Sequence, residues 1–457
     1  MMNTTRILQT GALVLTLLAS GVMAAVSEQE AAQLGANLTP LGAEKAGNAD
    51  GSIPAWDGGL PTDAATVDAN GFLGDPFASE QPQFTITAAT AEQYKDKLSP
   101  GQLAMFKRYP NTYKMPVYPS HRTAALPQAL YDIAKKSALD TQAVDGGNGL
   151  TNFADSRYYP FPIPKDGVQV LWNHITRYRG GNTRRHVAQA VPQTNGAYTV
   201  TSLVDEFAFP SHMTGVDKAK GANILYYFRQ TVTAPARLSG TVILVHETID
   251  QVKEPRLAWI YNAGQRRVRR APQIAYDGPG TAADGMRTAD NFDLYNGAPD
   301  RYEWKLVGKK EMYIPYNSYR LDSNKLKYAD ILKPGHINQD LARYELHRVW
   351  EVVATLKADK RHIYARRHMF FDEDTWQLAL VDHYDGRGQL WRIAEGHAVQ
   401  HYQRQVPVYA MESLYDIIAG RYVVLGMRNE EKRGSEFGIE ASASDFTPAA
   451  LRASGVR

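Results

Sequence analysis

Two histidines and three acids are the residues whose types and spacing could do metal chemistry. His397 and His401 are four residues apart and would share one face of a helix, where they could chelate a divalent metal. No carboxylates stand at a convincing spacing to complete the site, so we expect surface or hydrogen-bonded histidines instead. Asp372, Glu373 and Asp374 point in different directions in a tight turn, which favours a solvated hairpin over a cation site. We therefore predict no metal ligands and no cofactor.

Common catalytic motifs are missing from the sequence. It contains no Gly-x-Ser-x-Gly elbow, no His-Glu-x-x-His, no phosphate loop and no dinucleotide fingerprint. The absence of cysteine excludes thiol catalysis and cysteine-ligated metals. We predict no catalytic residue. The alternative is an envelope hydrolase that uses His246, Glu247 and the later histidines; one side chain of this pair is expected to point inward, where an ionisable group is costly unless it is paired.

Aromatic residues on the predicted strands indicate binding instead. Leu257, Trp259 and Tyr261 alternate on one strand face, and Trp350 and Trp376 lie on the faces of other strands. A small closed sheet buries such rings as ordinary packing, whereas a wide, half-open barrel leaves them around an apolar pocket. We predict that these five residues form the wall of a hydrophobic cavity.

Basic clusters could meet anionic groups at the edge of this cavity. Arg267, Arg269 and Arg270 belong to a dense run that suits a rim for a ligand headgroup or for an acidic partner. The same run could instead protect an edge strand from aggregation. A second patch, open to the same two interpretations, consists of Arg177, Arg179, Arg184, Arg185 and His186.

Strands are the elements that must position these residues. From about Val168 onward, segments rich in Val, Ile, Tyr and Trp recur between turn residues, as in Ile224–Thr233 and Gly240–Ile249. A meander from Leu346 to Ile393 has turns too short for parallel pairing. We predict a mainly β fold with α cover: a large antiparallel sheet or unclosed β-barrel, with helices and long loops packed on it.

Four regions follow from this pattern. We expect a signal peptide over 1–24, a helical and irregular N-terminal cover over 25–160, an antiparallel β half-barrel over 161–428, and a fraying tail over 429–457. Residues 88–107 should form two short helices broken at Ser99-Pro100. The Gly/Ala/Asp loop 271–300 is long enough to be a lid or binding loop, with a hinge at Asp277–Gly285.

The N-terminus predicts export. Arg6, the apolar run Ile7–Val22 and the small residues Ala24 and Ala25 have the order of a secretory signal. We therefore expect a periplasmic protein cleaved near Ala24 or Ala25, and not a lipoprotein, because a lipobox needs cysteine. No other stretch approaches the roughly 20 apolar residues of a spanning helix. The 51 basic and 48 acidic side chains argue against a nucleic-acid partner.

Five longer strings resemble a known family: Leu38–Gly47, Trp259–Pro272, Tyr302–Asn317, Phe371–Trp376 and Asp382–Arg392. They are similar to those of the uncharacterised proteobacterial family of unknown function DUF1329. That family is grouped with outer-membrane lipoprotein-sorting carriers of the LolA/LolB type. The resemblance implies an unclosed barrel with a hydrophobic cavity that receives an acyl chain. It also implies a resistance-nodulation-division type transporter and an outer-membrane protein as partners.

Residues and resemblance lead to one hypothesis. The protein would be a periplasmic binding or shuttle protein for a lipophilic ligand: a lipid, an acyl chain or another hydrophobic molecule. The alternatives are the envelope hydrolase and a non-catalytic assembly partner of a membrane export complex, which would dock through the N-terminal arm and the arginine run.

Overall fold

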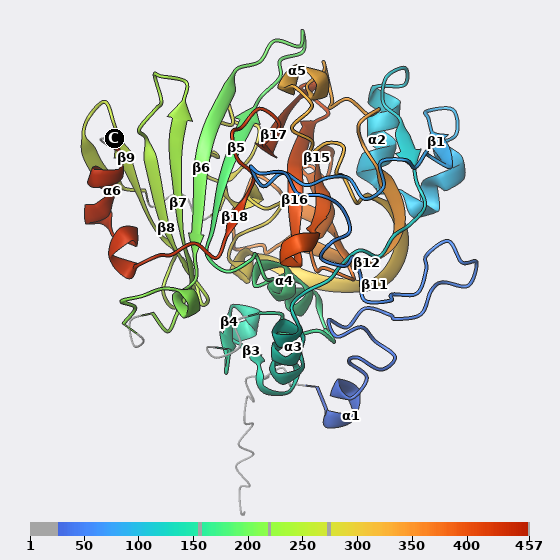
Figure 1. The fold of residues 1–457 in the computed structure, drawn as a ribbon, viewed down its shortest axis with the longest axis horizontal. Coiled ribbons are helices and arrows are strands. Elements are labelled where there is room, and N and C mark those ends of the chain that lie inside the picture. The colour runs from blue at the N-terminus through green and yellow to red at the C-terminus, as the bar shows by residue number, and fades with distance from the viewer. Residues whose placement is uncertain (1–25, 154–157, 218–220, 272–275, 456–457) are drawn as a thin grey trace, which may run out of the picture.

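The structure is a computed structural model that describes residues 26–153, 158–217, 221–271 and 276–455. The predicted signal peptide and its cleavage site lie outside these ranges. The described chain is built around one large sheet with a few short helices (Figure 1). None of the helices in these ranges is long and apolar enough to cross a membrane.

Sixteen strands of the described chain form the sheet, and two more form a separate hairpin. The sheet contains β1 (Phe84–Ile86), β2 (Met115–Val117), β5 (Thr183–Ala190), β6 (Val200–Ala208), β7 (Ile224–Ala234), β8 (Val242–Thr248), β9 (Leu257–Asn262), β10 (Arg267–Arg270), β11 (Tyr302–Pro315), β12 (Tyr344–Leu356), β13 (Arg366–Asp372), β14 (Leu378–Tyr384), β15 (Leu390–His401), β16 (Val406–Asp416), β17 (Arg421–Met427) and β18 (Glu436–Phe437). The hairpin is β3 (Gln142–Val144) and β4 (Gly149–Thr151). The α-helices are α1 (Glu28–Ala31), α2 (Pro100–Arg108), α3 (Gln128–Asp140), α4 (Gly167–Ile175), α5 (Tyr328–Ile331) and α6 (Pro448–Gly455). The 3-10 helices are η1 (Ala91–Lys97), η2 (Asp145–Gly147), η3 (Pro210–His212), η4 (Ala289–Asn291), η5 (Pro299–Arg301), η6 (Tyr402–Arg404) and η7 (Ala443–Phe446).

The sheet runs from edge to edge as β1-β2-β12-β13-β14-β15-β16-β17-β5-β6-β7-β8-β9-β10, with β11 paired to β12 and β18 paired to β5. Neighbouring strands are antiparallel, apart from one parallel contact between Val117 of β2 and Tyr344 of β12. Within the described ranges the edge strands β1 and β10 do not pair, so the sheet is unclosed. The predicted fold class is therefore confirmed.

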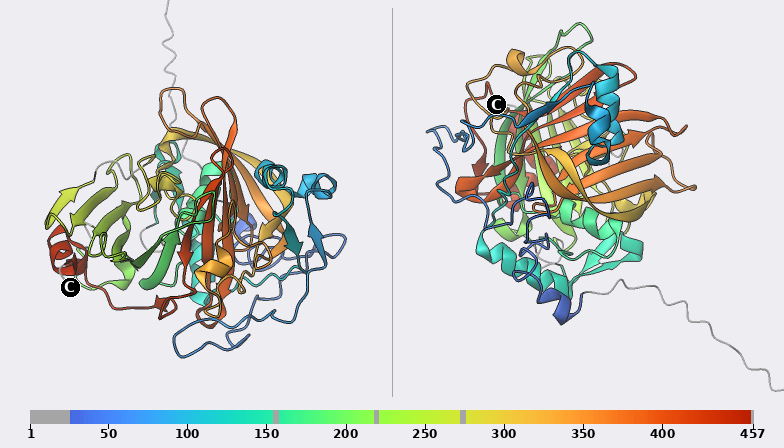
Figure 2. Two further views of the ribbon diagram at one scale, coloured as in Figure 1. Left: turned by 90° about the horizontal axis from the view of Figure 1, so that it is seen from above. Right: turned by 90° about the vertical axis from the view of Figure 1, so that its right-hand side faces the viewer.

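Strands β11–β17 form what we name the packed section, because other elements cover both of its faces. We call the face that carries Val352 and Leu414 the inner face. Helix α4 packs there against β11 and β12, and its Leu171 and Trp172 are buried in the same core as Val352 and Leu414. Gly167 permits the close approach of α4, since a Cβ at this position would lie 2.9 Å from Cγ1 of Val352. Figure 2 shows the sheet from two further directions.

Helix α4 corrects one expectation, because the sequence pattern predicts strands from about Val168. Asp166 accepts a hydrogen bond from the backbone N–H of Gln169 at 2.9 Å and so caps the helix. All nine residues of α4 are buried. A helix that is buried on every side shows no amphipathic period, and its run of Val, Leu and Trp then looks like a strand.

The outer face of the packed section is covered by N-terminal elements. Ser99 caps α2 in a reciprocal capping box with Gln102, so the predicted break between two short helices is confirmed. Met105 and Phe106 of α2 share a second core with Ile393 of β15. Within the region 25–160, predicted as cover, β1 and β2 also join the edge of the sheet.

Strands β7–β9 form what we name the pocket section, and its outer face is covered by the C-terminus. Helix α6 packs over β8, β9 and β10 (Figure 1). Phe446 and Leu451 form a core there with Leu244 and Tyr261. The expectation that the chain frays from residue 429 is therefore wrong, because β18 pairs with β5 and α6 closes a hydrophobic face. The inner face of the pocket section lies under the loop 276–300.

Candidate functional site

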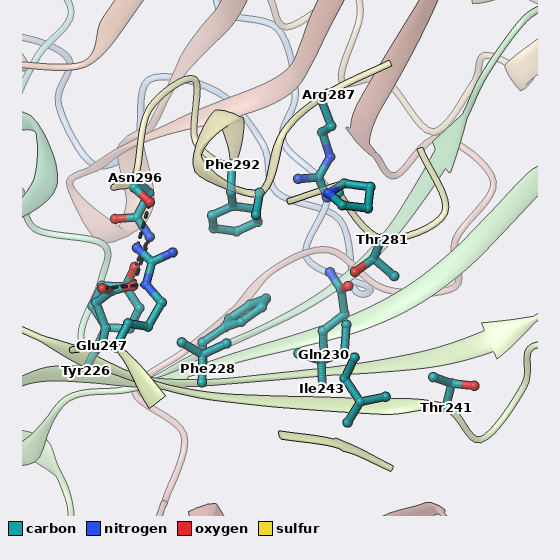
Figure 3. A pocket seen from close by; sticks show the side chains of 16 residues that line it. Tyr226, Phe228, Gln230, Thr241, Ile243, Glu247, Thr281, Arg287, Phe292 and Asn296 are labelled. Carbon is teal, nitrogen blue, oxygen red and sulfur yellow. Dashed lines mark hydrogen bonds and ion pairs between the residues drawn. The ribbon is translucent and has the colours of Figure 1, made fainter. Parts of the chain in front are cut away.

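A pocket of about 300 Å³ lies between the inner face of β7–β9 and the loop 276–300 (Figure 3). This volume is at the lower end of the range of small-molecule sites, roughly 300–1,000 Å³. Sixteen residues line it, most of them on alternate positions of the three strands or in the loop: Tyr226, Phe228, Gln230, Thr241, Ile243, Val245, Glu247, Arg256, Ile260, Pro279, Gly280, Thr281, Arg287, Ala289, Phe292 and Asn296.

Strand register makes the floor of the pocket apolar. Phe228 of β7 lies opposite Val245 of β8, and Ile243 of β8 lies opposite Ile260 of β9. Because successive side chains of a strand point to opposite faces, these four share the inner face. Phe292 packs above Phe228, with 5.3 Å between the ring centroids. The side chains of Ile243 and Val245 are buried, while those of Phe228, Ile260 and Phe292 are partly exposed.

The roof of the pocket is a loop with one firmly held half. In residues 289–296, Asp290 pairs with the buried Arg367 at 2.7 Å and Asp293 pairs with Arg177. Leu294 and Tyr295 are fully buried beside them. This half is therefore part of the core.

The other half of the roof, residues 277–287, buries Ala283 and Met286 and is also tied to the rest of the chain by polar bonds. The side chain of Gln189 donates to the carbonyl oxygens of Thr281 and Ala282 at 2.9 and 2.7 Å. Arg392 Nη2 donates to the carbonyl oxygen of Gly285 at 2.9 Å. The ion pairs of this half, Asp284 with Arg421 and Asp277 with Arg301, are partly exposed and contribute less than the buried pairs of residues 289–296, so this half is held less firmly.

One end of the pocket is a closed polar network. Glu247 accepts from Arg256 Nε at 2.9 Å, from Gln251 at 2.7 Å and from Asn296 at 3.1 Å. Asn296 also donates to the hydroxyl of Tyr226 at 2.8 Å. Burial would lower the pKa of Arg256, but the charge of Glu247 outweighs it and raises that pKa.

The opposite end of the pocket carries a different charge. Figure 3 shows Arg287 and Thr281 there, with Phe228 and Phe292 between them and Glu247. Arg287 is 5% exposed. Burial lowers the pKa of its guanidinium, while the charges of Glu412 and Asp205 oppose that shift.

The predicted cavity wall on β9 faces the wrong way. Leu257, Trp259 and Tyr261 lie on the outer face, where Trp259 and Tyr261 pack in the core under α6. Ala258 and Ile260 occupy the inner face instead. The physical reason is that both faces of β9 are covered, and the larger rings fill the face that has a helix to pack against.

The other two predicted wall residues belong to the packed section. Trp376 is fully buried after β13 and donates from Nε1 to the carbonyl oxygen of Leu41 at 2.9 Å. Trp350 stacks on it with 6.0 Å between ring centroids, and Lys309 Nζ lies 4.8 Å from the Trp350 centroid. Neither tryptophan lines the pocket, because both are packing residues beneath the N-terminal arm.

The predicted rim arginines lie on the edge strand β10, next to the pocket section. Arg267 pairs with Asn262 and Arg269 with Ile260, so these two side chains are on the inner face, and Arg270 is on the outer face with Trp259. All three are exposed, and no ion pair joins them to another described residue. Their role as a rim stays a prediction.

The second basic patch is neutralised within the described chain. Arg177 and Arg179 bind Asp293, Arg184 binds Glu206 at 3.0 Å, Arg185 binds Asp205 at 2.9 Å, and His186 lies 3.4 Å from Glu436. These residues hold the roof loop and the strands β5, β6 and β18 together, which leaves little charge for an external anion.

His246 and Glu247 do not form one site. His246 points to the outer face, where its Nε2–H donates to the carbonyl oxygen of Phe446 at 2.7 Å. Glu247 points to the inner face and is paired with Arg256. One side chain of the pair therefore points inward, as the strand pattern predicted, and strand alternation keeps the two from acting in one site.

His397 and His401 lie on strand β15, not on a helix. Four residues along a strand span roughly 13 Å, too far for one metal ion. Burial lowers the pKa of both histidines to about 3, so each is neutral. His397 Nε2 lies 3.3 Å from Ser413 Oγ, which agrees with the expectation of hydrogen-bonded histidines.

The Asp372–Asp374 turn is buried, so the expected solvated hairpin is wrong. Arg122 forks over Asp374 with N···O distances of 2.6 and 2.9 Å, and Lys309 bonds Glu373 at 2.9 Å. Asp372, Asp374 and His347 have possible ligand atoms within 4.8 Å of one another. A guanidinium already supplies the positive charge here, and burial with the neighbouring Asp374 raises the pKa of Asp372 to about 7.

Sequence reasoning missed the residues that line the pocket. Phe228, Ile243 and Val245 carry the alternation of any half-buried strand, and Arg287 stands alone in a loop of small residues. The signal that could have directed attention to the correct face was the apolar C-terminal segment Pro448–Gly455, which supplies a cover for the aromatic face of β9.

Comparisons with known proteins place the chain among relatives of unknown function. The family of proteins of unknown function DUF1329 matches residues 85–452. An uncharacterised protein of Pseudomonas aeruginosa is 66% identical over 457 residues, the whole of both chains. A solved DUF1329 family protein from Desulfovibrio piger is 13% identical, with a TM-score of 0.41, and the match covers 71% of this chain and 98% of that one. A solved LolA superfamily protein from Nitrosomonas europaea is 11% identical, with a TM-score of 0.36, over 62% of this chain and 98% of that one.

Proposed function

The chain belongs to the DUF1329 family, and on that premise we propose that it is a periplasmic carrier that binds a lipophilic small molecule in the pocket of β7–β9. The observation that carries this proposal is the pocket itself. It is apolar along its middle and polar at its two ends, as binding sites for organic ligands generally are.

Burial of apolar ligand surface would supply the binding free energy, at about 25 cal/mol per Å². Phe228, Ile243, Val245, Ile260 and Phe292 are the surfaces that the ligand would cover. The polar ends would orient it. The cavity volume suits one acyl chain or one compact skeleton better than a lipid with several chains.

Entry and release would use the less firmly held half of the roof. Residues 277–287 include the predicted hinge Asp277–Gly285 and are fixed by the bonds from Gln189 and Arg392. Arg267 and Arg269, at the open edge, would attract an anionic ligand or an acidic partner surface. The transporter and outer-membrane partners stay predictions, as does export through the signal at residues 1–24.

The test is binding of Nile red, a neutral lipophilic dye, to the purified chain from residue 26. Wild type should bind the dye with a rise in fluorescence, and Val245→Phe should weaken binding about tenfold or more because the ring fills the cavity. Val252→Phe is the matched control, since Val252 is 53% exposed in the turn before β9. No dye binding by wild type, or equal binding by all three proteins, would overturn the proposal.

A further inference from the structure

Arg287 differs from every other buried arginine in the described part of the chain. Eight arginines are buried there, and seven have a carboxylate oxygen within 3.3 Å; Arg367, 2.7 Å from Asp290, is an example. Arg287 is the eighth. Among the described residues its guanidinium has no carboxylate within ion-pair distance, its Nε has no partner, and its Nη1 makes only a 3.5 Å contact with the Thr288 carbonyl oxygen.

A charged side chain that is buried without a partner is energetically costly, and a guanidinium cannot remove this cost by losing its proton. A buried carboxyl group without a cation can take up a proton, but arginine keeps its charge at any pH a protein meets. The two acids whose charge reaches Arg287 have other partners. Asp205 binds Arg185 at 2.9 Å and Gln230 at 2.8 Å. Glu412 accepts from the backbone N–H of Leu294 at 2.9 Å, and burial raises its pKa to about 7.

The guanidinium is placed at the pocket by a glycine. A Cβ on Gly280 would lie 2.7 Å from Cγ, Cζ and Nη1 of Arg287, so the side chain of Arg287 lies directly against the Gly280 backbone. Both residues line the cavity. An unpaired, nearly buried cation therefore faces an apolar space of about 300 Å³.

From these contacts we infer that the ligand is a single-chain amphiphile with an oxyanion head, which binds Arg287 while its apolar chain lies along Phe228 and Ile243. This inference rests on the proposed function and specifies its ligand. A carboxylate or phosphate head matches the fork of a guanidinium with two parallel hydrogen bonds. The far end of the pocket does not compete for such a head, because its charges, Glu247 and Arg256, already satisfy each other.

The experiment compares three C12 probes by calorimetric titration at pH 7.5: dodecanoate, dodecyl phosphate and dodecan-1-ol. Wild type should bind at least one of the two acids about tenfold or more tighter than the alcohol, since hydrogen bonds to charged groups are strong. The two acids distinguish a carboxylate head from a phosphate head. Arg287→Met should lose this preference and still bind dodecan-1-ol, which also shows that the variant is folded.

Two further variants complete the test. Arg287→Lys keeps the charge without the fork and should retain a smaller preference for the acid. Arg270→Met removes an exposed arginine from the outer face of β10 and should bind as wild type does. Equal affinity of wild type for acids and alcohol would overturn the inference and leave the proposed function standing. Failure of all three probes to bind would overturn both.

Discussion

The packed section and the pocket section are parts of one sheet, yet their inner faces are filled in different ways. In β11–β17, helix α4 inserts Leu171 and Trp172 into the core, and a glycine brings the helix against Val352. In β7–β9 the corresponding face meets only a loop, and about 300 Å³ is left. A broad antiparallel sheet cannot fill itself, so the presence or absence of a helix decides where a cavity remains.

The two sections also treat buried charge differently. Arg367 lies on β13, and Asp290 of the firmly held half of the roof and three tyrosine rings surround its guanidinium. Arg287 lies in the roof loop, a few residues before Asp290, and has no carboxylate partner among the described residues. On our inference, the first arginine serves the fold and the second serves a ligand.

The largest effect should come from removing these two arginines in turn. Arg367→Met leaves Asp290 buried without its cation, so the free energy of unfolding should fall by about 3–5 kcal/mol. Arg287→Met removes a buried cation that has no partner, so the same quantity should stay constant or rise. Urea unfolding of the ligand-free proteins measures both. If Arg287→Met destabilises the protein as much as Arg367→Met does, the comparison fails.

The next largest effect should come from a larger side chain on the inner face, which should destabilise the packed section more than the pocket section. Val352→Phe forces a ring under α4, where Gly167 already approaches closely, and should cost about 1–3 kcal/mol of stability. Val245→Phe places the same ring into the cavity and should change stability by less than about 1 kcal/mol. Thermal unfolding followed by circular dichroism checks the pair. Similar losses for both variants would show that the pocket section is already full.

The buried acids of the packed section should make the stability of the protein depend on pH, whereas Arg287 keeps its charge and does not titrate in this range. Burial raises the pKa of Asp382 to about 7 and that of Glu395 to about 8. The folded state therefore holds more protons than the unfolded state, whose carboxyl groups titrate near pH 4. Stability from these groups is full below about pH 4 and falls, by up to about 1.4 kcal/mol per pH unit and group, until about pH 8.

Urea unfolding between pH 5 and pH 8 measures this slope. Asp382→Asn keeps one side-chain oxygen that can accept from the Gly101 N–H and turns its NH2 group toward the Ser99 hydroxyl, which can accept, and it should flatten the curve. Arg270→Met, on the outer face of β10, should leave the slope unchanged. A wild-type protein that gains stability across this range would contradict the assignment.

The smallest effect concerns the rim. Arg267→Gln with Arg269→Gln should weaken dodecanoate binding about two- to threefold at low ionic strength, because exposed charges contribute little. The effect should vanish at high salt. Arg270→Gln, on the outer face, serves as control. A loss of affinity that does not depend on salt, or an equal loss in the control, would contradict a role of Arg267 and Arg269 in attracting the ligand.

Sequence patterns predicted the fold well and the site poorly, for identifiable reasons. The short turns of the Leu346–Ile393 meander fixed antiparallel pairing, and Ser99-Pro100 fixed the start of α2, because both signals are local. The inner face of β9 depends on the distant helix α6, and a single step in register exchanges Trp259 for Ile260. Arg287 stands out only because no described carboxylate lies within ion-pair distance of it. That property depends on how distant parts of the chain pack, so a local sequence pattern cannot predict it.

The most direct test is mass spectrometry of an organic extract from the native protein after its purification from the cells that produce it. We predict an acidic, single-chain amphiphile in close to one-to-one amount from wild type, and its loss from Val245→Phe. A wild-type extract without such a molecule, or identical extracts from both proteins, would contradict the claim that the pocket section exists to hold a lipophilic ligand.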